Sequence, residues 1–250
     1  MKTAILVTGQ YRPQVNKYKP QKLIQQMESV FKTHMFFHTW NDSTNIVPIE
    51  YHNRLVYCAQ PELDYHPVSD IEWVGKHGKW EPYVEKRLLY NKMQHASKQI
   101  LAYADLLTKI PDDFDVLIRI RWDILVSEEV NFKPYLEKAY EEGPVGFMTR
   151  GGRKHNIDRL YELPKAAGNP LDLPRAALGE SDIEFEKDDW YGYLPDNIIM
   201  HRRDHFDIDQ VKELHREKNL APAEWGWYQI LSEPYGDIHT SVHGGAQIAR

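Results

Sequence analysis

The spacing of hydrophobic positions changes along the chain, and the changes outline alternating strands and helices. Continuous apolar runs at 3–9, 34–40 and 54–59 are typical of buried strands in a parallel sheet. Between the first two runs, apolar residues from Leu23 to Phe31 recur at helical spacing. The pattern therefore predicts a β-α-β unit at the start of the chain, followed by a third strand.

The longest regular pattern lies in the middle of the chain. Apolar residues keep a spacing of three to four over 84–107, which predicts one long amphipathic helix that ends before Pro111. The preceding segment, 60–82, is punctuated by glycine and proline and is predicted to be a loop. The segment that follows, DVLIRIRWDILVS at 115–127, is predicted to be a single strand.

The second half of the chain alternates in the same way around one irregular stretch. We expect a helix near 131–143, strands at 144–149 and 193–202, helices at 207–219 and 221–233, and a tail that is extended and then frayed. Residues 150–189 are rich in glycine, proline and charge, and so long an irregular stretch usually forms a lid or a mobile segment. The whole pattern predicts one α/β domain with a mostly parallel central sheet flanked by helices and an irregular insertion near 150–190.

Composition and charge narrow the class of protein. The chain has 250 residues, is 42% hydrophobic and 27% charged, and is therefore expected to fold as a globular protein. A net charge of −6 disfavours nucleic acid as the main partner. There is no signal-peptide pattern and no apolar run of about 18 residues, so we expect a cytoplasmic protein without stable membrane insertion. The single cysteine, Cys58, excludes an intrachain disulfide.

The strand predicted at 115–127 carries charge where a buried strand is expected to be apolar. Arg119, Arg121 and Asp123 occupy alternate positions and would share one face. Unpaired charge inside a sheet is costly, so these side chains need a partner or a ligand. Two interpretations stay open, namely an internal ion pair and a site for a diphosphate with a divalent cation.

Other candidate residues follow the apolar runs, because ligands of open α/β sheets bind beyond the carboxyl ends of the strands. The segment TGQYR at 8–12 lacks the GxGxxG and GxxxxGK phosphate-binding motifs. It is either a simple polar turn or a place where Gly9 lets the backbone approach a nucleotide. The segments HTWND at 38–42 and PDN at 195–197 are the remaining candidates of this kind.

Several motifs in their order along the chain resemble one known family. They are ILVTGQYR, FFHTW, KMQHASKQILAYADLL, FDVLIRIRWDILV, PDNIIMHRRDHFD and PAEWGWYQIL. Together they resemble the WavE-type polysaccharide glycosyltransferases of bacteria and viruses. The resemblance implies a GT-A-like, Rossmann-type nucleotide-diphospho-sugar transferase fold in a single domain, 1–250. Within it, 1–126 would be the nucleotide-binding half and 127–250 the acceptor half, with a lid-like segment at 150–190.

The resemblance also implies roles for individual residues. An acidic motif after a central strand holds Mn²⁺ or Mg²⁺ against the donor diphosphate in such enzymes, and Asp123 takes that place. The usual Asp-x-Asp is Arg-Trp-Asp here, so the first carboxylate is missing and arginine would supply part of the positive charge. His243 is the expected second metal ligand, with His239 as its rival.

The remaining candidates concern the acceptor and the donor. Asp196 and Glu224 are candidates for the carboxylate that deprotonates the acceptor hydroxyl, although each could be only a turn or helix-start residue. Trp190, Trp225 and Trp227 are candidates for packing on sugar rings. The donor and its diphosphate would be bound by Thr8, Gly9, Gln10, Tyr11, Arg12, Trp40, Arg119 and Arg121.

We therefore expect a glycosyltransferase of polysaccharide biosynthesis that moves a sugar from a nucleotide-sugar donor to a hydroxyl acceptor, assisted by Mn²⁺ or Mg²⁺. A non-catalytic nucleotide or glycan-binding module is the first alternative. A metal-dependent phosphoryl-handling enzyme is the second, which the shortage of clustered carboxylates disfavours. Modified DNA as the acceptor would require a basic surface beside the site.

Overall fold

The computed structural model describes residues 1–9, 17–40, 47, 49–58, 98–149, 163–164, 190–191, 194–217, 220, 223–236 and 238–248. The main-sheet strands are β1 (Thr3–Thr8), β2 (His34–Trp40), β3 (Leu55–Cys58), β4 (Val116–Arg121), β5 (Ile124–Val126), β6 (Val145–Thr149), β9 (Ile198–Arg202) and β10 (Thr240–Ile248). The helices are α1 (Pro20–Phe31), a helix over 98–107, α3 (Lys133–Glu141), α6 (Ile208–Arg216) and α7 (Ala223–Leu231). Short 3-10 helices are η2 (Ile49–Arg54), η5 (Arg203–His205) and η6 (Glu233–Tyr235), and the two-residue strands β7 (Leu163–Pro164) and β8 (Trp190–Tyr191) pair separately.

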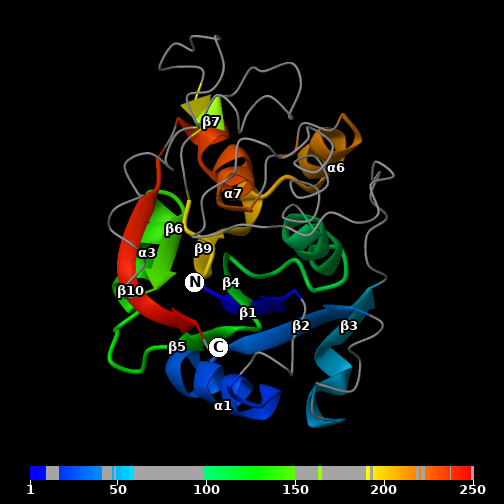
Figure 1. Cartoon of the computed structure of the whole chain (residues 1–250), viewed down its shortest axis with the longest axis vertical. Coiled ribbons are helices and arrows are strands. Elements are labelled where there is room, and N and C mark those ends of the chain that lie inside the picture. Colours follow the sequence, from blue (N-terminus) through cyan, green and yellow to red (C-terminus); the bar gives the residue numbers. More distant parts are fainter. Residues whose placement is uncertain are drawn as a thin grey trace, which may run out of the picture.

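The main sheet has eight strands in the order β3-β2-β1-β4-β9-β6-β10-β5 (Figure 1). Strands β3, β2, β1 and β4 are mutually parallel, β9 runs antiparallel to both β4 and β6, and β10 runs parallel to β6. Strand β5 runs antiparallel to β10. The α/β class with a mostly parallel central sheet flanked by helices, as expected from the sequence, is confirmed.

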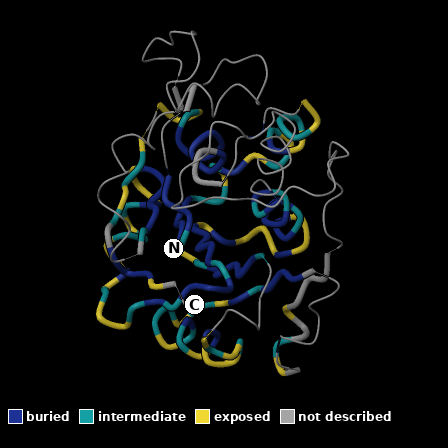
Figure 2. Tube along the Cα trace, viewed as in Figure 1, coloured by how far each residue is buried: buried dark blue, intermediate teal, exposed yellow. Residues whose placement is uncertain are grey.

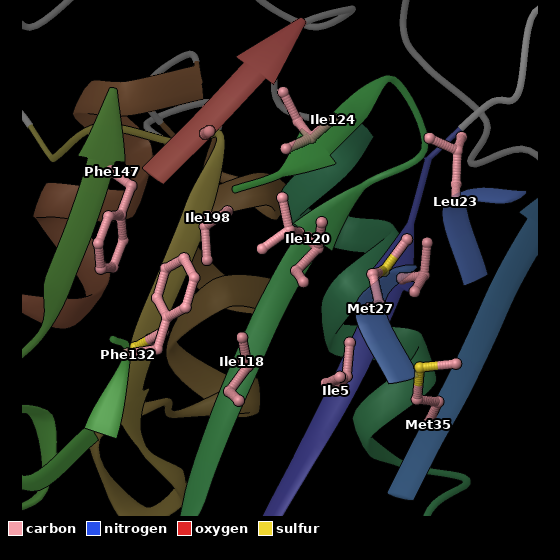
Figure 3. Close-up of a cluster of buried hydrophobic side chains, with 14 of the residues drawn as sticks. Ile5, Leu23, Met27, Met35, Ile118, Ile120, Ile124, Phe132, Phe147 and Ile198 are labelled. Carbon is pink, nitrogen blue, oxygen red and sulfur yellow. The ribbon is translucent and has the colours of Figure 1, made fainter. Parts of the chain in front are cut away.

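Helices cover both faces of this sheet. Alternate residues of β1 and β4 divide between two apolar clusters, since Leu6 and Leu117 join one cluster and Ile5 and Ile118 join the other. The first cluster includes the helix over 98–107, α6 and α7, whereas the second includes α1 and α3. Figure 2 shows that the central strands between them are mostly buried, and Figure 3 shows side chains of the second cluster. Burial on both faces explains why the strands appear as continuous apolar runs.

Local chemistry places several helix ends. Pro20 lies in the first turn of α1, where its missing N–H group costs no hydrogen bond. The helix ends at Lys32, whose φ of 50° is left-handed and whose N–H donates to the carbonyl of Glu28. Asp207 caps α6 by accepting hydrogen bonds from the N–H groups of Asp209 and Gln210.

The predicted elements at 3–9, 23–31, 34–40, 54–59, 131–143, 144–149, 207–219 and 221–233 are confirmed with small changes at their ends. Of the long helix predicted over 84–107, the structure describes 98–107, and this part is helical. Within the predicted insertion the structure describes only β7 and the first residue of β8. None of the helices in the described part of the chain combines the length and apolar content needed to cross a bilayer.

One sequence prediction is wrong. Residues 115–127 form two strands, β4 and β5, separated by a turn at Trp122 and Asp123, because β5 leaves β4 to pair with β10. The error arises from a strand pairing between residues far apart in the sequence. The prediction of an extended tail is confirmed by β10, which lies between β6 and β5 as far as Ile248, and the last two residues lie outside the described part of the chain.

Candidate active site

The ends of three strands meet at one edge of the sheet. In the parallel pair of β1 and β4, Thr8 lies opposite Arg121, so both strands finish together. Strand β9 runs the other way, with Ile198 opposite Ile120, so the chain enters β9 at that same edge. Asp196, two residues before β9, is thereby brought to the carboxyl end of β4. This edge is where open α/β sheets bind ligands.

Arg119 is the most deeply buried charged residue at this edge. Its side chain has 0% exposure, its Nε donates to the Thr8 hydroxyl at 3.3 Å, and its two Nη groups donate to the Asp196 carbonyl oxygen and the Gln99 side-chain oxygen. The Asp196 carboxylate lies 3.8 Å from Nη1. The guanidinium also lies 5.2 Å from the centre of the Trp227 ring. Arg119 therefore ties β1, the helix over 98–107, α7 and the start of β9 together.

Arg121 stands between two carboxylates. Its Nε and Nη2 donate to Asp123 at 2.9 and 2.8 Å in a bidentate pair. Its Nη1 donates to the carboxylate oxygens of Asp196 at 3.3 and 3.4 Å. The first two distances are those of charge-assisted hydrogen bonds, whereas the last two are longer. Asp123 therefore fixes the guanidinium, and Asp196 binds it more weakly.

We call Arg119, Arg121, Asp123 and Asp196 the charged cluster. It contains two positive and two negative groups and is formally balanced. Burial lowers the pKa of Arg119 to about 10, with the Asp196 carboxylate acting in the opposite direction, so Arg119 stays charged at neutral pH. The exposed fraction of the side chain is 4% for Asp196, 11% for Asp123 and 25% for Arg121. Arg121 is thus the member of the cluster that solvent and ligands reach most easily.

Trp122 holds the turn that returns Asp123 to Arg121. Its indole Nε1 donates to the carbonyl oxygen of His38 in β2 at 3.0 Å, and its ring stacks on Phe37 with centroids 5.7 Å apart. Trp122 is 1% exposed. Because this large side chain is anchored in the apolar face, the chain turns after β4 and Asp123 lies beside Arg121.

Gly146 positions the Asp196 segment from the other side. A Cβ atom at this glycine of β6 would lie 2.6 Å from the carbonyl oxygen of Pro195 and 2.8 Å from its Cδ atom. Both distances are shorter than side chains tolerate, so the 194–196 segment approaches β6 only because residue 146 has no side chain. The close packing of this segment fixes Asp196 against the two arginines.

A neutral hydrogen-bonded pair, Tyr103 and His201, supports the charged cluster through Trp227. The carbonyl oxygen of Arg202 accepts from His201 Nδ1 at 2.6 Å, so His201 Nε2 accepts from the Tyr103 hydroxyl at 2.7 Å. Burial lowers the pKa of His201 to about 4 and raises the pKa of Tyr103. The Tyr103 ring contacts the edge of Trp227 with centroids 5.2 Å apart. This pair therefore fixes the indole on which Arg119 lies.

The structure brings four of the predicted site residues into direct contact, namely Thr8, Arg119, Arg121 and Asp196, together with the predicted metal ligand Asp123. Gly9 follows at the end of β1 with a φ of 102°, and no atom of the described residues lies within 4 Å of the position that a Cβ would take. Gln10, Tyr11 and Arg12 lie outside the described residues. So do the side chains of Trp40, Trp190, Glu224, Trp225 and His243, although the backbone of each belongs to a described strand or helix.

The described residues do not fit a divalent metal ion. No group of three or more His, Cys, Asp or Glu side chains in the described part of the chain is arranged to hold one. Asp123, the expected ligand, is engaged by Arg121 through both carboxylate oxygens. His243 pairs in register with Met148, and its rival His239 contacts the Tyr228 ring edge-on with centroids 5.5 Å apart.

Sequence reasoning missed three residues that build this site. Gln99 was part of the predicted long helix, Gly146 of a predicted strand, and Tyr103 of the same helix as Gln99. Each acts on a residue distant along the chain. Of the three, only Gln99 had a local signal in the sequence, as a polar residue in a largely apolar helical segment.

No protein-family model and no curated protein matches the sequence. Among solved structures, the chain is similar to a mannose-1-phosphate geranyltransferase from Thermus thermophilus, with 11% identity and a TM-score of 0.46 over 99% of this chain and 75% of that one. The chain is also similar to a 4-diphosphocytidyl-2C-methyl-D-erythritol synthase from Anaerococcus prevotii, with 9% identity and a TM-score of 0.45 over 100% of this chain and 90% of that one. A third similar structure is the galactosyltransferase LgtC in complex with donor and acceptor sugar analogs, with 9% identity and a TM-score of 0.40 over 97% of this chain and 73% of that one. Similarities of this size do not place the chain in a family.

Proposed function

We propose that this protein is a glycosyltransferase that moves a sugar from a nucleoside-diphosphate donor to a hydroxyl acceptor. The observation that supports this function is the meeting of the carboxyl ends of β1 and β4 with Asp196 at one edge of the sheet. The edge offers a guanidinium for a diphosphate, a glycine for close backbone approach and a carboxylate for proton removal. The acceptor would be a glycan of polysaccharide biosynthesis, and the reaction cytoplasmic.

The two arginines would have different roles. Arg121, whose side chain is 25% exposed, would contact the donor diphosphate. Arg119, whose side chain is fully buried, would act on the donor only through the residues that it positions, Thr8 and Asp196. Gln10, Tyr11, Arg12 and Trp40 stay in the proposal as residues that surround the nucleotide.

The reaction breaks the bond between the anomeric carbon and the diphosphate oxygen and forms a bond from that carbon to the acceptor oxygen. The diphosphate leaves with the electron pair, and Arg121 would stabilise its charge. Asp196 would take the proton of the acceptor hydroxyl, with Glu224 as the alternative base. Its long contacts of 3.3 and 3.4 Å with Arg121 favour Asp196 for this role over Asp123, which Arg121 binds more tightly. Because the described residues do not fit a metal, no step is assigned to one.

A nucleotide or glycan-binding module without turnover is the second candidate function. The observation that favours it is that both carboxylates of the charged cluster are bound to Arg121. A base that remains paired with a guanidinium does not accept a proton. Such a protein would bind the donor and release no nucleoside diphosphate.

The test is release of nucleoside diphosphate from a panel of nucleotide sugars mixed with hydroxyl acceptors. The wild type is compared with Asp196→Asn and with Asp204→Asn, a matched change at an exposed carboxylate outside the site. We expect one donor to be turned over, Asp204→Asn to keep the rate, and Asp196→Asn to lose about 10²- to 10⁴-fold. Full activity of a folded Asp196→Asn variant would reject Asp196 as the base. Binding of a donor without release by the wild type would favour the binding module.

A further inference from the structure

The geometry points to a cation site that the protein fills with its own side chain: Arg121 occupies the position between Asp123 and Asp196 that a divalent metal would otherwise take. The guanidinium donates to both carboxylates, at 2.8 and 2.9 Å on one side and 3.3 and 3.4 Å on the other. A positive group shared by two carboxylates is the arrangement that a bound cation would have. We infer that the protein does not bind Mn²⁺ or Mg²⁺ between Asp123 and Asp196. If the protein has the proposed function, on which this second part of the inference rests, the donor diphosphate binds without metal.

The pairing of charges makes replacement of Arg121 by a metal unfavourable. Asp196 is 4% exposed and Asp123 is 11% exposed, so both carboxylates interact with Arg121 in a largely water-free setting. A metal entering between them would displace the guanidinium from both carboxylates, and breaking buried ion pairs is strongly destabilising. The bidentate fork of Arg121 on Asp123 also occupies both oxygens that a metal would need.

The Arg121 side chain keeps a solvent-accessible part. One quarter of its side chain is exposed, whereas Arg119 beside it has no exposed surface. A fixed guanidinium at the end of a parallel strand can bind phosphate oxygens in a fork. The anchoring of Arg121 by Asp123 would give the diphosphate a rigid cationic partner in place of an exchangeable ion.

A second Arg-x-Asp pair in the chain provides the control. Arg202 donates from Nε to Asp204 at 2.8 Å and from Nη2 to its other oxygen, with the same spacing in sequence as Arg121 and Asp123. That pair is exposed at 38% and 62%. Removal of Arg202 leaves the carboxylate of Asp204 in solvent, whereas removal of Arg121 opens a space between two neighbouring buried carboxylates.

The experiment measures Mn²⁺ binding to the full chain, without nucleotide, by water-proton relaxation and by the melting temperature. We expect no Mn²⁺ binding that depends on Asp123, at millimolar concentration, in the wild type or in Arg202→Gln. Arg121→Gln should gain binding, with a Mn²⁺-dependent rise of about 5 °C in melting temperature. Adding Asp123→Asn to that variant should remove the gain.

Two results would overturn the inference. One is Mn²⁺ binding by the wild type that Asp123→Asn abolishes, and this result decides the matter even if Arg121→Gln does not fold. The other is a folded Arg121→Gln variant that binds no Mn²⁺. Because no nucleotide is present, both results are independent of whether the protein is a transferase. A separate series of binding measurements tests whether the donor diphosphate binds without metal. Nucleoside diphosphates should then bind equally well in EDTA and in Mn²⁺.

Discussion

Two Arg-x-Asp segments end neighbouring strands of the sheet, and their surroundings differ. In both, the arginine binds the aspartate two residues later through Nε and Nη2. The pair of Arg202 and Asp204 lies at the far edge, where Arg202 is opposite Val116 at the start of β4. It is exposed and has no second carboxylate among its ion pairs, as far as the chain is described. The pair of Arg121 and Asp123 is largely buried and is joined by Asp196 and Arg119.

The local motif and the fold contribute differently to the charged cluster. The Arg-x-Asp spacing, at a strand end that is followed by a turn or a 3-10 helix, gives the bidentate pair at both places. An exposed pair of this kind contributes at most about 1 kcal/mol. At the end of β4, burial and two further charges turn the same motif into a polar site, because each charge there depends on partners from other elements. The motif by itself therefore does not identify the site.

The largest expected effect comes from removing the carboxylate that only the β4 segment has. Asp196→Ala should lower the free energy of unfolding by about 3–5 kcal/mol, because Arg119 is fully buried and would lose its counter-charge. Asp204→Ala should cost no more than about 1 kcal/mol. Urea unfolding of both variants measures the contrast. Equal losses would contradict the difference drawn between the two segments.

Acid unfolding should separate the buried region from the exposed pair. Burial lowers the pKa of His201 to about 4, below the value of 6.5 that it has when unfolded. The unfolded chain therefore binds more protons between these values, and stability falls as the pH drops from 6.5 to 4, by on the order of 3 kcal/mol for this group. His38, with a pKa also lowered to about 4 by burial, adds a similar dependence.

His201→Gln should flatten this part of the stability profile without removing the contribution of His38. Asp204 behaves differently, because its hydrogen bond with Arg202 lowers its pKa. Its contribution is present above the unfolded value of 3.8 and is lost only as the pH falls below it. Asp204→Asn should thus leave the profile above pH 4 unchanged. A wild-type profile that is flat from pH 6.5 to 4 would show that His201 is not held neutral.

A smaller change should act through the backbone that carries Asp196. Gly146→Ala places a methyl group against Pro195, where the available distance is 2.6 Å, and should destabilise the protein by about 1–3 kcal/mol. The shifted segment would also weaken the contact of Asp196 with Arg121. The transfer assay should therefore lose activity in this variant even at temperatures where it is fully folded. Unchanged activity and stability would mean that the close approach is not needed.

The smallest expected effect is that of Arg202→Gln. Its pair with Asp204 is exposed, so the loss should be below about 1 kcal/mol and should shrink further at high salt. Thermal unfolding at low and high ionic strength measures it. A loss as large as that of Asp196→Ala would remove the distinction between an exposed and a buried pair.

The sequence was sufficient for features that depend on neighbouring residues. Helical spacing predicted α1, and apolar runs predicted β1, β2 and β6, because burial on both sheet faces leaves a clear local pattern. The charges at 119, 121 and 123 stand out against the same local pattern. The sequence also left open whether they pair internally, which they do.

Features that depend on distant contacts were not predictable. Asp123 was placed on a strand, but the bond from Trp122 to His38 and the pairing of β5 with β10 make it a turn residue. The antiparallel direction of β9, which brings Asp196 to the site, has no local signal. The contact of Gly146 with Pro195 is of the same kind, since a glycine in a strand shows that space is needed without showing for what.

In the proposed function, the charged cluster at the end of β4 binds a nucleoside diphosphate through Arg121. Thermal unfolding of the wild type, Arg121→Gln and Arg202→Gln with nucleoside diphosphates in EDTA tests it most directly. At 100 times its dissociation constant a ligand adds about 2.7 kcal/mol, so one nucleotide should raise the melting temperature by about 5–10 °C for the wild type and Arg202→Gln. The rise should be absent for folded Arg121→Gln. An equal rise in all three proteins, or none for the wild type with any nucleotide, would contradict the claim.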